Sequence, residues 1–334
     1  MSKILALGEI MLRLSTDMGD LLMNSNQLNV HYGGAEANVA STLGNFGHQI
    51  YFASKLPNSP LADAAIRNLR ANAVDTSHVL RGGSRLGVYY LEKGSSLRPS
   101  KVIYDRKHSA LADMSLNEWD FDQLFFDVRL FHITGITFAL AEKWHQFGQH
   151  LIEEAYHRGI PVSFDINFRS SMWTLEMARR SICPILPMIS YCCANYLDAR
   201  NFFSIDSSIA RQDRMEACYD EVSRKFPNLK AIYATNRSVV SASDNTLQGV
   251  LWDRGHFVES PSHRLAPIVD RIGGGDAFVA GILHGILKSM TAEDTLHFAM
   301  SAALLKHTIK GDHSLLSEQD VQSWICSSNG EVKR

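Results

Sequence analysis

Short apolar runs recur along the chain and have the length and composition of buried strands. They predict strands over Ile4–Gly8, Ile50–Ser54, Leu130–Thr134, Val162–Asp165, Ile189–Ala194 and Lys230–Thr235. Several of these runs are continuous rather than alternating, which is typical of parallel strands that are covered on both faces.

Segments with helical periodicity separate these strands. They predict helices over Ala35–Phe46, Pro60–Ala71, Leu140–His157, Thr174–Leu186 and Arg211–Phe226, and further helices near Ala277–Lys288 and Ala292–Lys310. The regular alternation of strand and helix predicts an α/β fold with a doubly wound, mostly parallel sheet flanked by helices.

Two regions break this alternation. Residues 12–32 and 85–106 contain strand-like stretches with no helix between them, most clearly Gly87–Glu92 and Lys101–Tyr104. We expect them to form a small separate sheet that lies over the ligand crevice as a lid. The chain is predicted to be one domain over residues 1–328, with a polar tail at 329–334 that frays.

Composition narrows the possible functions. The chain has 334 residues, a net charge of −2 and 45% hydrophobic residues, so it can bury a large core and has no electrostatic footprint for nucleic acid. No apolar run is long enough to span a membrane, and the amino terminus resembles a first strand rather than a signal peptide. The five cysteines are odd in number and form no C-x-x-C pair, which favours reduced thiols in a cytoplasmic protein.

The segment Val269–Gly285 carries the strongest chemical signal. Three consecutive glycines, Gly273, Gly274 and Gly275, are followed by Asp276 and an apolar helical run. Glycines allow backbone N–H groups to converge, and the start of a helix adds unsatisfied donors, so the segment predicts an anion site suited to phosphate oxygens. A carboxylate beside such a site is suited to take a proton from a hydroxyl that attacks a phosphate.

Polar clusters also follow several predicted strands or open a helix. They contain Gly33, Gly34 and Asn38; Asp165, Asn167 and Arg169; Asn195 and Asp198; and Thr235 and Arg237. Each cluster alone is compatible with an ordinary turn or loop. The carboxyl ends of strands line the ligand crevice of an open α/β sheet, so together the clusters favour a binding site.

The early Gly33-Gly34-x-x-x-Asn38 and the late Asp270-x-x-Gly273-Gly274-Gly275-Asp276 together resemble the ribokinase-like carbohydrate kinases, also called the phosphofructokinase-B family. The late signature of that family is D-T-x-G-A-G-D, and this chain has Arg271 in place of the threonine and Gly274 in place of the alanine. Glycine preserves the anion site, and arginine is found at this place in some sugar-acid kinases of the family. The resemblance covers nearly the whole chain and implies a ribokinase-like fold with a small lid.

Further stretches resemble the 2-keto-3-deoxygluconate kinases within that family. They are Tyr104–Arg106, Asp165–Trp173, Ser241–Asn245 and Leu305–Asp312. The resemblance implies ATP-dependent phosphorylation of the terminal hydroxyl of a sugar acid, most closely 2-keto-3-deoxygluconate to its 6-phosphate. A carboxylate substrate requires positive partners, and an arginine fork binds a carboxylate in two places.

The resemblance also assigns roles to individual residues. Asp276 becomes the general base, and Gly273, Gly274 and Gly275 stabilise the transferred phosphoryl group. The implied sugar-acid contacts are Gly33, Gly34, Asn38, Tyr89, Tyr104, Arg106, Arg169, Asp276 and Asp312. The implied ATP contacts are Asn167, Arg169, Asn195, Thr235, Arg237, Gly273 and Gly275. Asp198 stands where the family has a glutamate linked to Mg²⁺, which it would reach through water, and the lid implies a homo-oligomer.

Three other functions compete with this hypothesis. A fructokinase or another neutral-sugar kinase would share every catalytic residue, but would not require arginines for a substrate carboxylate. A non-catalytic sugar- or nucleotide-binding regulator should lack the base at position 276. A dinucleotide-binding dehydrogenase is disfavoured because Ile4–Gly8 leads into Glu9-Ile10-Met11 rather than a G-x-G-x-x-G turn.

Overall fold

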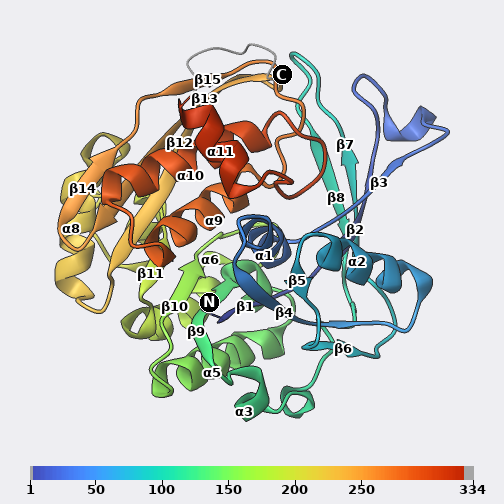
Figure 1. Ribbon diagram of the computed structural model, residues 1–334, viewed down its shortest axis with the longest axis horizontal. Coiled ribbons are helices and arrows are strands. Elements are labelled where there is room, and N and C mark those ends of the chain that lie inside the picture. Colours follow the sequence, from blue (N-terminus) through green and yellow to red (C-terminus); the bar gives the residue numbers. More distant parts are fainter. Residues whose placement is uncertain (1–2, 327–334) are drawn as a thin grey trace.

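The computed structural model describes residues 3–326 and is built around one large sheet (Figure 1). Its strands lie in the order β14-β13-β12-β11-β10-β9-β1-β4-β5, with β15 beside β13 and β6 beside β4. The pairs from β12 through β1 to β5 are parallel, whereas β13, β14 and β15 extend the sheet in antiparallel fashion. The strands are β1 (Lys3–Leu7), β4 (Gln49–Leu56), β5 (Val74–Asp75), β6 (Val79–Arg81), β9 (Val128–Thr134), β10 (Val162–Asp165), β11 (Tyr191–Cys193), β12 (Ala231–Ser241), β13 (Asp244–Asp253), β14 (His256–Glu259) and β15 (His263–Leu265).

Helices cover both faces of this sheet, and each face has its own hydrophobic core. One core contains side chains of α5, α6, α7 and α8, and the other contains side chains of α1, α2, α9, α10 and α11. Strand β1 contributes to both, because Leu5 faces the first core and Ile4 the second. The helices are α1 (Ala35–Asn45), α2 (Pro60–Ala71), α3 (Phe121–Leu124), α4 (Gly135–Phe138), α5 (Glu142–His157), α6 (Leu175–Ile182), α7 (Tyr196–Phe202), α8 (Met215–Lys225), α9 (Gly274–Leu287), α10 (Ala292–Lys306) and α11 (Glu318–Cys326).

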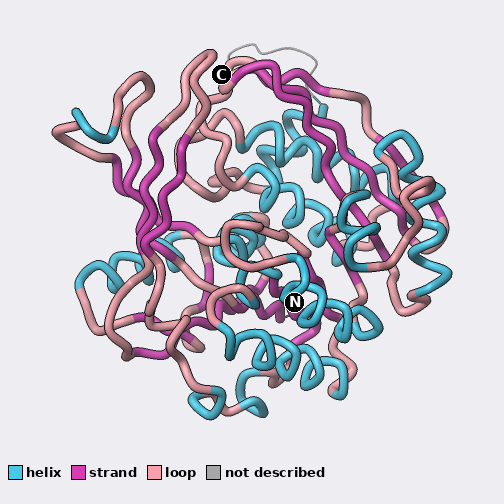
Figure 2. Tube along the Cα trace, turned by 180° about the vertical axis from the view of Figure 1, so that it is seen from behind, coloured by secondary structure: helices cyan, strands magenta, loops and turns pink. Residues whose placement is uncertain are grey.

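A four-stranded sheet projects from one side of the molecule, as both backbone views show (Figures 1 and 2). Its strands lie in the order β3-β2-β7-β8, with bounds β2 (Met11–Ser15), β3 (Asn29–Gly33), β7 (Val88–Glu92) and β8 (Lys101–Asp105). At its tip, the N–H of Ala242 in the β12–β13 turn donates to the carbonyl of Ser96, over 2.9 Å. This sheet is the predicted lid, and its tip contacts the turn of the β12–β13 hairpin of the large sheet.

The doubly wound, mostly parallel α/β sheet is confirmed, and most element positions agree with the prediction. Several details differ. The helix predicted over Thr174–Leu186 changes to a 3-10 helix at Cys183, where Pro184 and Pro187 interrupt the regular hydrogen bonding. The last predicted helix ends at Lys306 rather than Lys310. Strands β5, β6, β13, β14 and β15 and helix α11 were not predicted.

The predicted tail at 329–334 lies outside the described residues. All five cysteines have free thiols. Within residues 3–326, no helix is both long and apolar enough to cross a membrane.

Candidate active site

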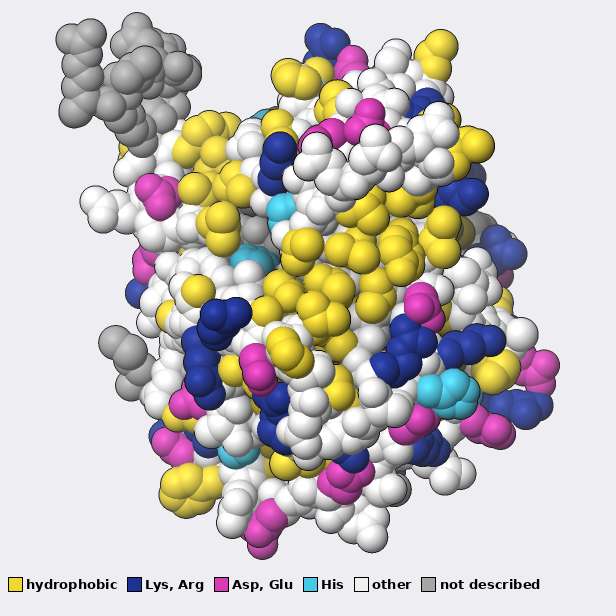
Figure 3. Space-filling view, turned by 90° about the vertical axis from the view of Figure 1, so that its right-hand side faces the viewer, with side chains coloured by type: hydrophobic (Ala, Val, Ile, Leu, Met, Phe, Trp, Pro, Cys, Tyr) yellow, Lys and Arg dark blue, Asp and Glu magenta, His cyan; other side chains and the backbone are white. Residues whose placement is uncertain are grey.

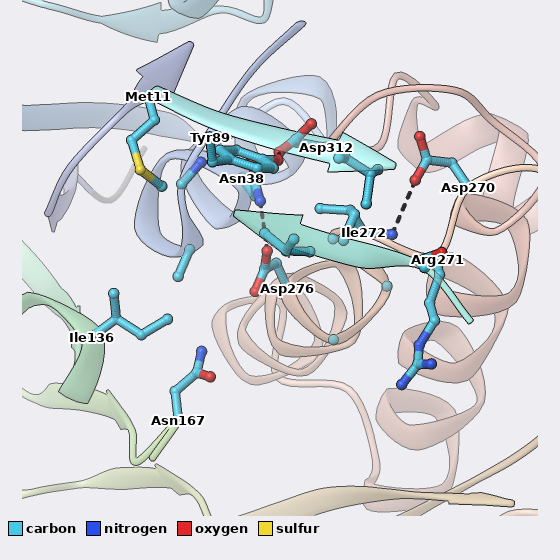
Figure 4. Close-up of a pocket in the computed structure, with 18 of the residues that line it drawn as sticks. Met11, Asn38, Tyr89, Ile136, Asn167, Asp270, Arg271, Ile272, Asp276 and Asp312 are labelled. Atoms are coloured by element: carbon cyan, nitrogen blue, oxygen red, sulfur yellow. Dashed lines mark hydrogen bonds between the residues drawn. The ribbon is translucent and has the colours of Figure 1, made fainter. Parts of the chain in front are cut away.

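A cavity of about 510 Å³ lies between the lid and the carboxyl ends of the parallel strands. Its floor comes from the ends of β10 and β12 and from the first turns of α1 and α9, and its roof comes from β7 and β8 of the lid. Ligands of open α/β sheets bind at this edge. Figure 4 shows the lining side chains from the lid, from α1 and from α9 converging on one space.

Asp276 lies at the start of α9, in the middle of the cavity wall. Its Oδ2 accepts a hydrogen bond of 2.6 Å from Nδ2 of Asn38 in the first turn of α1 (Figure 4). The Oδ1 of Asn38 in turn accepts from the N–H of Gly34, over 3.3 Å. The side chain of Asn38 is therefore held from both sides, and it fixes the orientation of the Asp276 carboxylate.

Burial raises the pKa of Asp276 to about 7, and the negative charges of Asp165 and Glu36 act in the same direction. The hydrogen bond from Asn38 and the positive charge of Arg169 oppose this rise. A carboxyl group with a pKa near neutrality is matched to proton transfer at physiological pH. The position and the pKa of Asp276 therefore suit a general base.

Each of the three positions before Asp276 is suited to glycine for a different structural reason. Gly273 caps α9 in the left-handed region, with φ of 79°, and a Cβ there would overlap the carbonyl oxygen of Asp312. A Cβ on Gly274 would overlap the ring of His307. Gly275 faces open space on the cavity side. The first two glycines allow the close packing that shapes the turn, and Gly275 leaves room for a ligand at the helix terminus.

A buried ionic network supports this turn from behind. The guanidinium of Arg13, on β2, binds Asp270 at 2.6 Å and Asp312 at 2.9 Å, and all three side chains are almost fully buried. The other carboxylate oxygen of Asp312 accepts a hydrogen bond from the hydroxyl of Tyr89. Arg13 therefore ties the lid to the segments on both sides of the glycine turn.

The predicted substrate arginines have different surroundings. Arg106 lines the cavity but forms an ion pair with the buried Glu9, with Nε 2.7 Å from Oε2. Arg169 lines the opposite wall and, within residues 3–326, forms no ion pair with a carboxylate. Its positive charge lowers the pKa values of Asp165, Asp198 and Asp276. Arg271 also lines the cavity without an ion pair among the described residues, so Arg169 and Arg271 are the arginines there whose charge no carboxylate neutralises.

The two faces of the lid differ in character. Direct pairing places His31, Arg13, Tyr89 and Tyr104 in one row across the four strands, on the face toward the cavity. The next row, on the opposite face, contains Val30, Leu14, Tyr90 and Ile103. The face toward the ligand thus combines this polar row with the apolar side chains of Met11, Leu91 and Val102, whereas the outer row is apolar.

The residues predicted to bind nucleotide are only partly brought together. Asn167 and Thr235 line the cavity, but Asn195 and Arg237 do not. Asn195 caps α7, and Asp198 accepts from its N–H at 3.0 Å, in a reciprocal capping arrangement. Arg237 binds Nε2 of His307 at 2.9 Å, beneath the glycine turn.

In total, the structure brings most of the predicted site residues to one cavity. Gly34, Asn38, Tyr89, Tyr104, Arg106, Asn167, Arg169, Thr235, Gly273, Gly274, Gly275, Asp276 and Asp312 line it. Gly33, Asn195, Asp198 and Arg237 lie outside the lining, and their binding roles remain predictions. A Cβ on Gly33 would overlap the carboxylate of Asp312, which explains the glycine structurally.

Several charged residues of the site were not predicted. Glu9, Glu36 and Lys93 line the cavity although all three are buried, Arg271 also lines it, and Arg13 supports it from behind. Arg13 stands alone among apolar neighbours, in the strand Met-Leu-Arg-Leu-Ser of β2. A single charge inside an apolar strand is the signal that could have found it, because an unpaired buried charge is strongly disfavoured.

Asp165 lines the cavity, and Asp198, outside the lining, is close enough to interact with it electrostatically. Burial raises the pKa of Asp165 to about 6 and that of Asp198 to about 7, and the repulsion between the two contributes to the rise at Asp198. A cation in this region would relieve that repulsion. In the described part of the chain, no group of three or more His, Cys, Asp or Glu side chains is arranged to hold a metal directly. The donors therefore fit a cation held mainly through water and phosphate oxygens.

Comparison with known proteins agrees with this geometry. Residues 1–318 match the family model described as "pfkB family carbohydrate kinase". A solved pfkB family carbohydrate kinase from Listeria grayi is 41% identical, with a TM-score of 0.93, and the match covers 97% of this chain and 100% of that one. A solved 2-dehydro-3-deoxygluconokinase from Thermotoga maritima is 35% identical, with a TM-score of 0.93 and coverage of 98% and 100%.

A further relative matches over the full length. The 2-dehydro-3-deoxygalactonokinase of Haloferax volcanii is 28% identical over 333 residues, which cover 100% of this chain and 99% of that protein. The fold, the glycine turn with its aspartate, and the family match over residues 1–318 lead to one assignment. The chain belongs to the pfkB family of carbohydrate kinases.

Proposed function

We propose that this kinase transfers the terminal phosphoryl group of ATP to the terminal hydroxyl of a sugar acid, with 2-keto-3-deoxygluconate as the best-fitting substrate. The observation that carries the proposal is the position of Asp276, which lies beside the Gly273–Gly275 turn at the start of α9 and in the same cavity as three arginines. The names of the Thermotoga and Haloferax relatives point to the same class of substrate.

The chemistry follows from the arrangement of the turn. Asp276 accepts the proton of the sugar hydroxyl while the hydroxyl oxygen forms a bond to the terminal phosphorus and the bond from phosphorus to ADP breaks. Backbone N–H groups at the start of α9 point toward the transferred group and stabilise its negative charge. Asn38 keeps the Asp276 carboxylate directed at the hydroxyl through its 2.6 Å hydrogen bond.

Mg²⁺ would be held near Asp165 and Asp198, largely through water and the phosphates of ATP. When bound, it would neutralise charge that develops on the phosphate oxygens. Asp198 already caps α7, so its contact would be indirect.

The charges of the cavity favour an acid over a neutral sugar. Glu9 already neutralises Arg106, whereas Arg169 and Arg271 line the cavity without an ion pair among the described residues. We assign the substrate carboxylate to Arg169, and Arg106 contributes donors of its fork. A charged hydrogen bond of this kind contributes roughly 1.5–3 kcal/mol, or about 10–150-fold in kcat/KM. A neutral sugar would leave this contribution unused.

A coupled assay of ADP release tests the substrate. We expect wild type to prefer 2-keto-3-deoxygluconate over fructose and ribose by at least about 10-fold in kcat/KM. Arg169→Met should remove this preference, whereas Arg200→Met, at an exposed arginine of α7 outside the cavity, should retain it. Equal kcat/KM for fructose and the keto acid in wild type would support the fructokinase alternative instead.

We also propose that the protein forms a homo-oligomer through the outer face of the lid. The row of Val30, Leu14, Tyr90 and Ile103 presents apolar side chains there, with Val30 56% and Ile103 43% exposed. Figure 3 faces the lid side of the molecule and shows hydrophobic side chains gathered into a continuous patch. Exposed apolar patches of this kind mark interaction surfaces.

Light scattering after size-exclusion chromatography tests this surface. Wild type should elute as a dimer or larger, and Ile103→Glu should shift it toward the monomer. Leu315→Glu is the matched control, because Leu315 is also exposed but does not belong to the row. A wild-type monomer at micromolar concentration would exclude this interface.

A further inference from the structure

A second cavity, of about 500 Å³, lies on the other side of Asp312 from the active site. It is formed where the edge strand β3 of the lid meets α2 and the loop that follows α10. Lid, helix and loop each contribute polar side chains: His31 from β3, Arg67 and Asn68 from α2, and Lys310 and His313 from the loop. Nothing in the mechanism above uses these five side chains.

Several polar groups in this cavity lack partners inside the protein. His313 is only 8% exposed, and its imidazole makes no hydrogen bond with any described residue. The Nε2 of His31 and the Oδ1 of Asn68 are buried and also have no hydrogen-bond partner. Buried polar groups in native proteins are nearly always paired. Two buried atoms without partners and the unpaired imidazole of His313 thus lie around one cavity, and a ligand there would complete the hydrogen bonds of that imidazole.

The charge of the cavity identifies the class of ligand. Arg67 and Lys310 line it, and within residues 3–326 neither forms an ion pair. The carboxylate in the wall is Asp312, and it already binds Arg13 and the hydroxyl of Tyr89. The cavity thus offers two cations without a counter-charge, together with imidazole groups that can donate hydrogen bonds.

The size and the remaining donors and acceptors narrow the class further. The two exposed cations match the charge of a phosphate monoester, which is about −1.5 to −2 at neutral pH. The space is larger than one phosphate group requires and is close to the volume of the active-site cavity. The side-chain amide of Asn68 lines the cavity and suits a ligand hydroxyl. A phosphorylated sugar has all of these features.

We propose that this second cavity is a binding site for a small sugar phosphate, separate from the active site. The phosphate lies between Arg67 and Lys310 and accepts from the imidazole of His313, while the sugar hydroxyls reach Asn68. The bound ligand rests against the segment Lys310–Asp312, whose last residue holds Tyr89 in the active site.

Calorimetric titration of the full chain with glucose 6-phosphate tests the site, because this probe carries no carboxylate for Arg169. We expect wild type to bind it, and Arg67→Ala and Lys310→Ala each to weaken binding by about 10-fold or more. Arg70→Ala is the matched control on the same helix, because Arg70 contacts Thr76 rather than the cavity. It should bind like wild type, as should Arg169→Met.

Three results would overturn the proposal. One is the absence of binding to wild type at millimolar probe. Another is loss of binding in Arg169→Met but not in Arg67→Ala, which would place the probe in the active site. The third is inorganic phosphate binding as tightly as glucose 6-phosphate, which would exclude a role for the sugar. Thermal unfolding of each variant without ligand verifies that a lost signal is not a lost fold.

Discussion

Replacing Asp276 with asparagine removes the proposed base with little change in shape. General-base catalysis contributes typically about 10²–10⁴-fold, so kcat should fall by that factor while ATP still binds. Wild-type kcat/KM should also rise with pH through about 7, the pKa to which burial raises this carboxyl, because the base must lose its proton before it can accept another. The variant should lack this acid limb.

The same substitution has a predictable effect on stability. The pKa of Asp276 rises from 3.8 to about 7 on folding, so between these pH values the folded state binds more protons than the unfolded state. Stability attributable to this group therefore falls as pH rises through that window. The shift corresponds to at most roughly 4 kcal/mol. Asparagine stays neutral, so the variant should unfold at a higher temperature than wild type at about pH 8, and this difference should shrink toward pH 4.

Two measurements verify these expectations: pH profiles of kcat/KM from the coupled assay, and thermal unfolding followed by circular dichroism across the same pH range. Asp113→Asn is a suitable control, because Asp113 is exposed and lies outside the cavity. If Asp276→Asn keeps more than a tenth of wild-type kcat, or keeps the acid limb, Asp276 is not the base.

Four further substitutions, and one double variant, test the surroundings of the site. Gly273→Ala should reduce kcat at least about 10-fold, because alanine strains the left-handed backbone at this position and its Cβ overlaps a carbonyl oxygen. Gly275→Ala should fold like wild type, because its Cβ meets open space. Equal losses of folded protein in the two variants would refute this interpretation of the turn. Arg106→Ala should raise KM for the sugar acid but not for ATP, and should lower the free energy of unfolding by about 3–5 kcal/mol because Glu9 is left buried without its partner. Adding Glu9→Gln should restore the stability but not the KM for the sugar acid. A parallel rise of both KM values would show that Arg106 does not belong to the sugar site. Arg13→Met should also cost about 3–5 kcal/mol, since it leaves two buried carboxylates unpaired, and a denaturant midpoint equal to that of wild type would contradict this.

Sequence patterns predicted the parallel part of the fold well, for a physical reason. Strands buried on both faces are mostly apolar, so a run such as residues 4–7, Ile-Leu-Ala-Leu, is visible without other information. Strand β13 was missed because Asp244–Asp253 mixes Asn, Gln and Gly with apolar residues and begins at a half-buried edge. Its pairing with β12 is set by the hairpin rather than by its own composition.

Only the site residues that belong to contiguous sequence motifs could be predicted. The glycine turn and Asn38 belong to contiguous patterns, and their positions agree with the cavity. The partners of the arginines could not be predicted, because Glu9 and Arg106 are separated by 97 residues and meet only through the lid. The capping role of Asn195 and Asp198 was also visible as a spacing, but spacing alone does not distinguish a helix cap from a metal contact.

The contact between lid and body has a consequence for how this sequence can drift over generations. The lid tip meets the β12–β13 turn through a hydrogen bond between the backbone groups of Ser96 and Ala242. Every residue except proline carries the N–H donor, and every residue carries the carbonyl acceptor. Closure at this point is therefore insensitive to most side-chain changes at either position. Homologous chains can vary in these two turns while the lid stays docked, and only proline at position 242 would remove the donor.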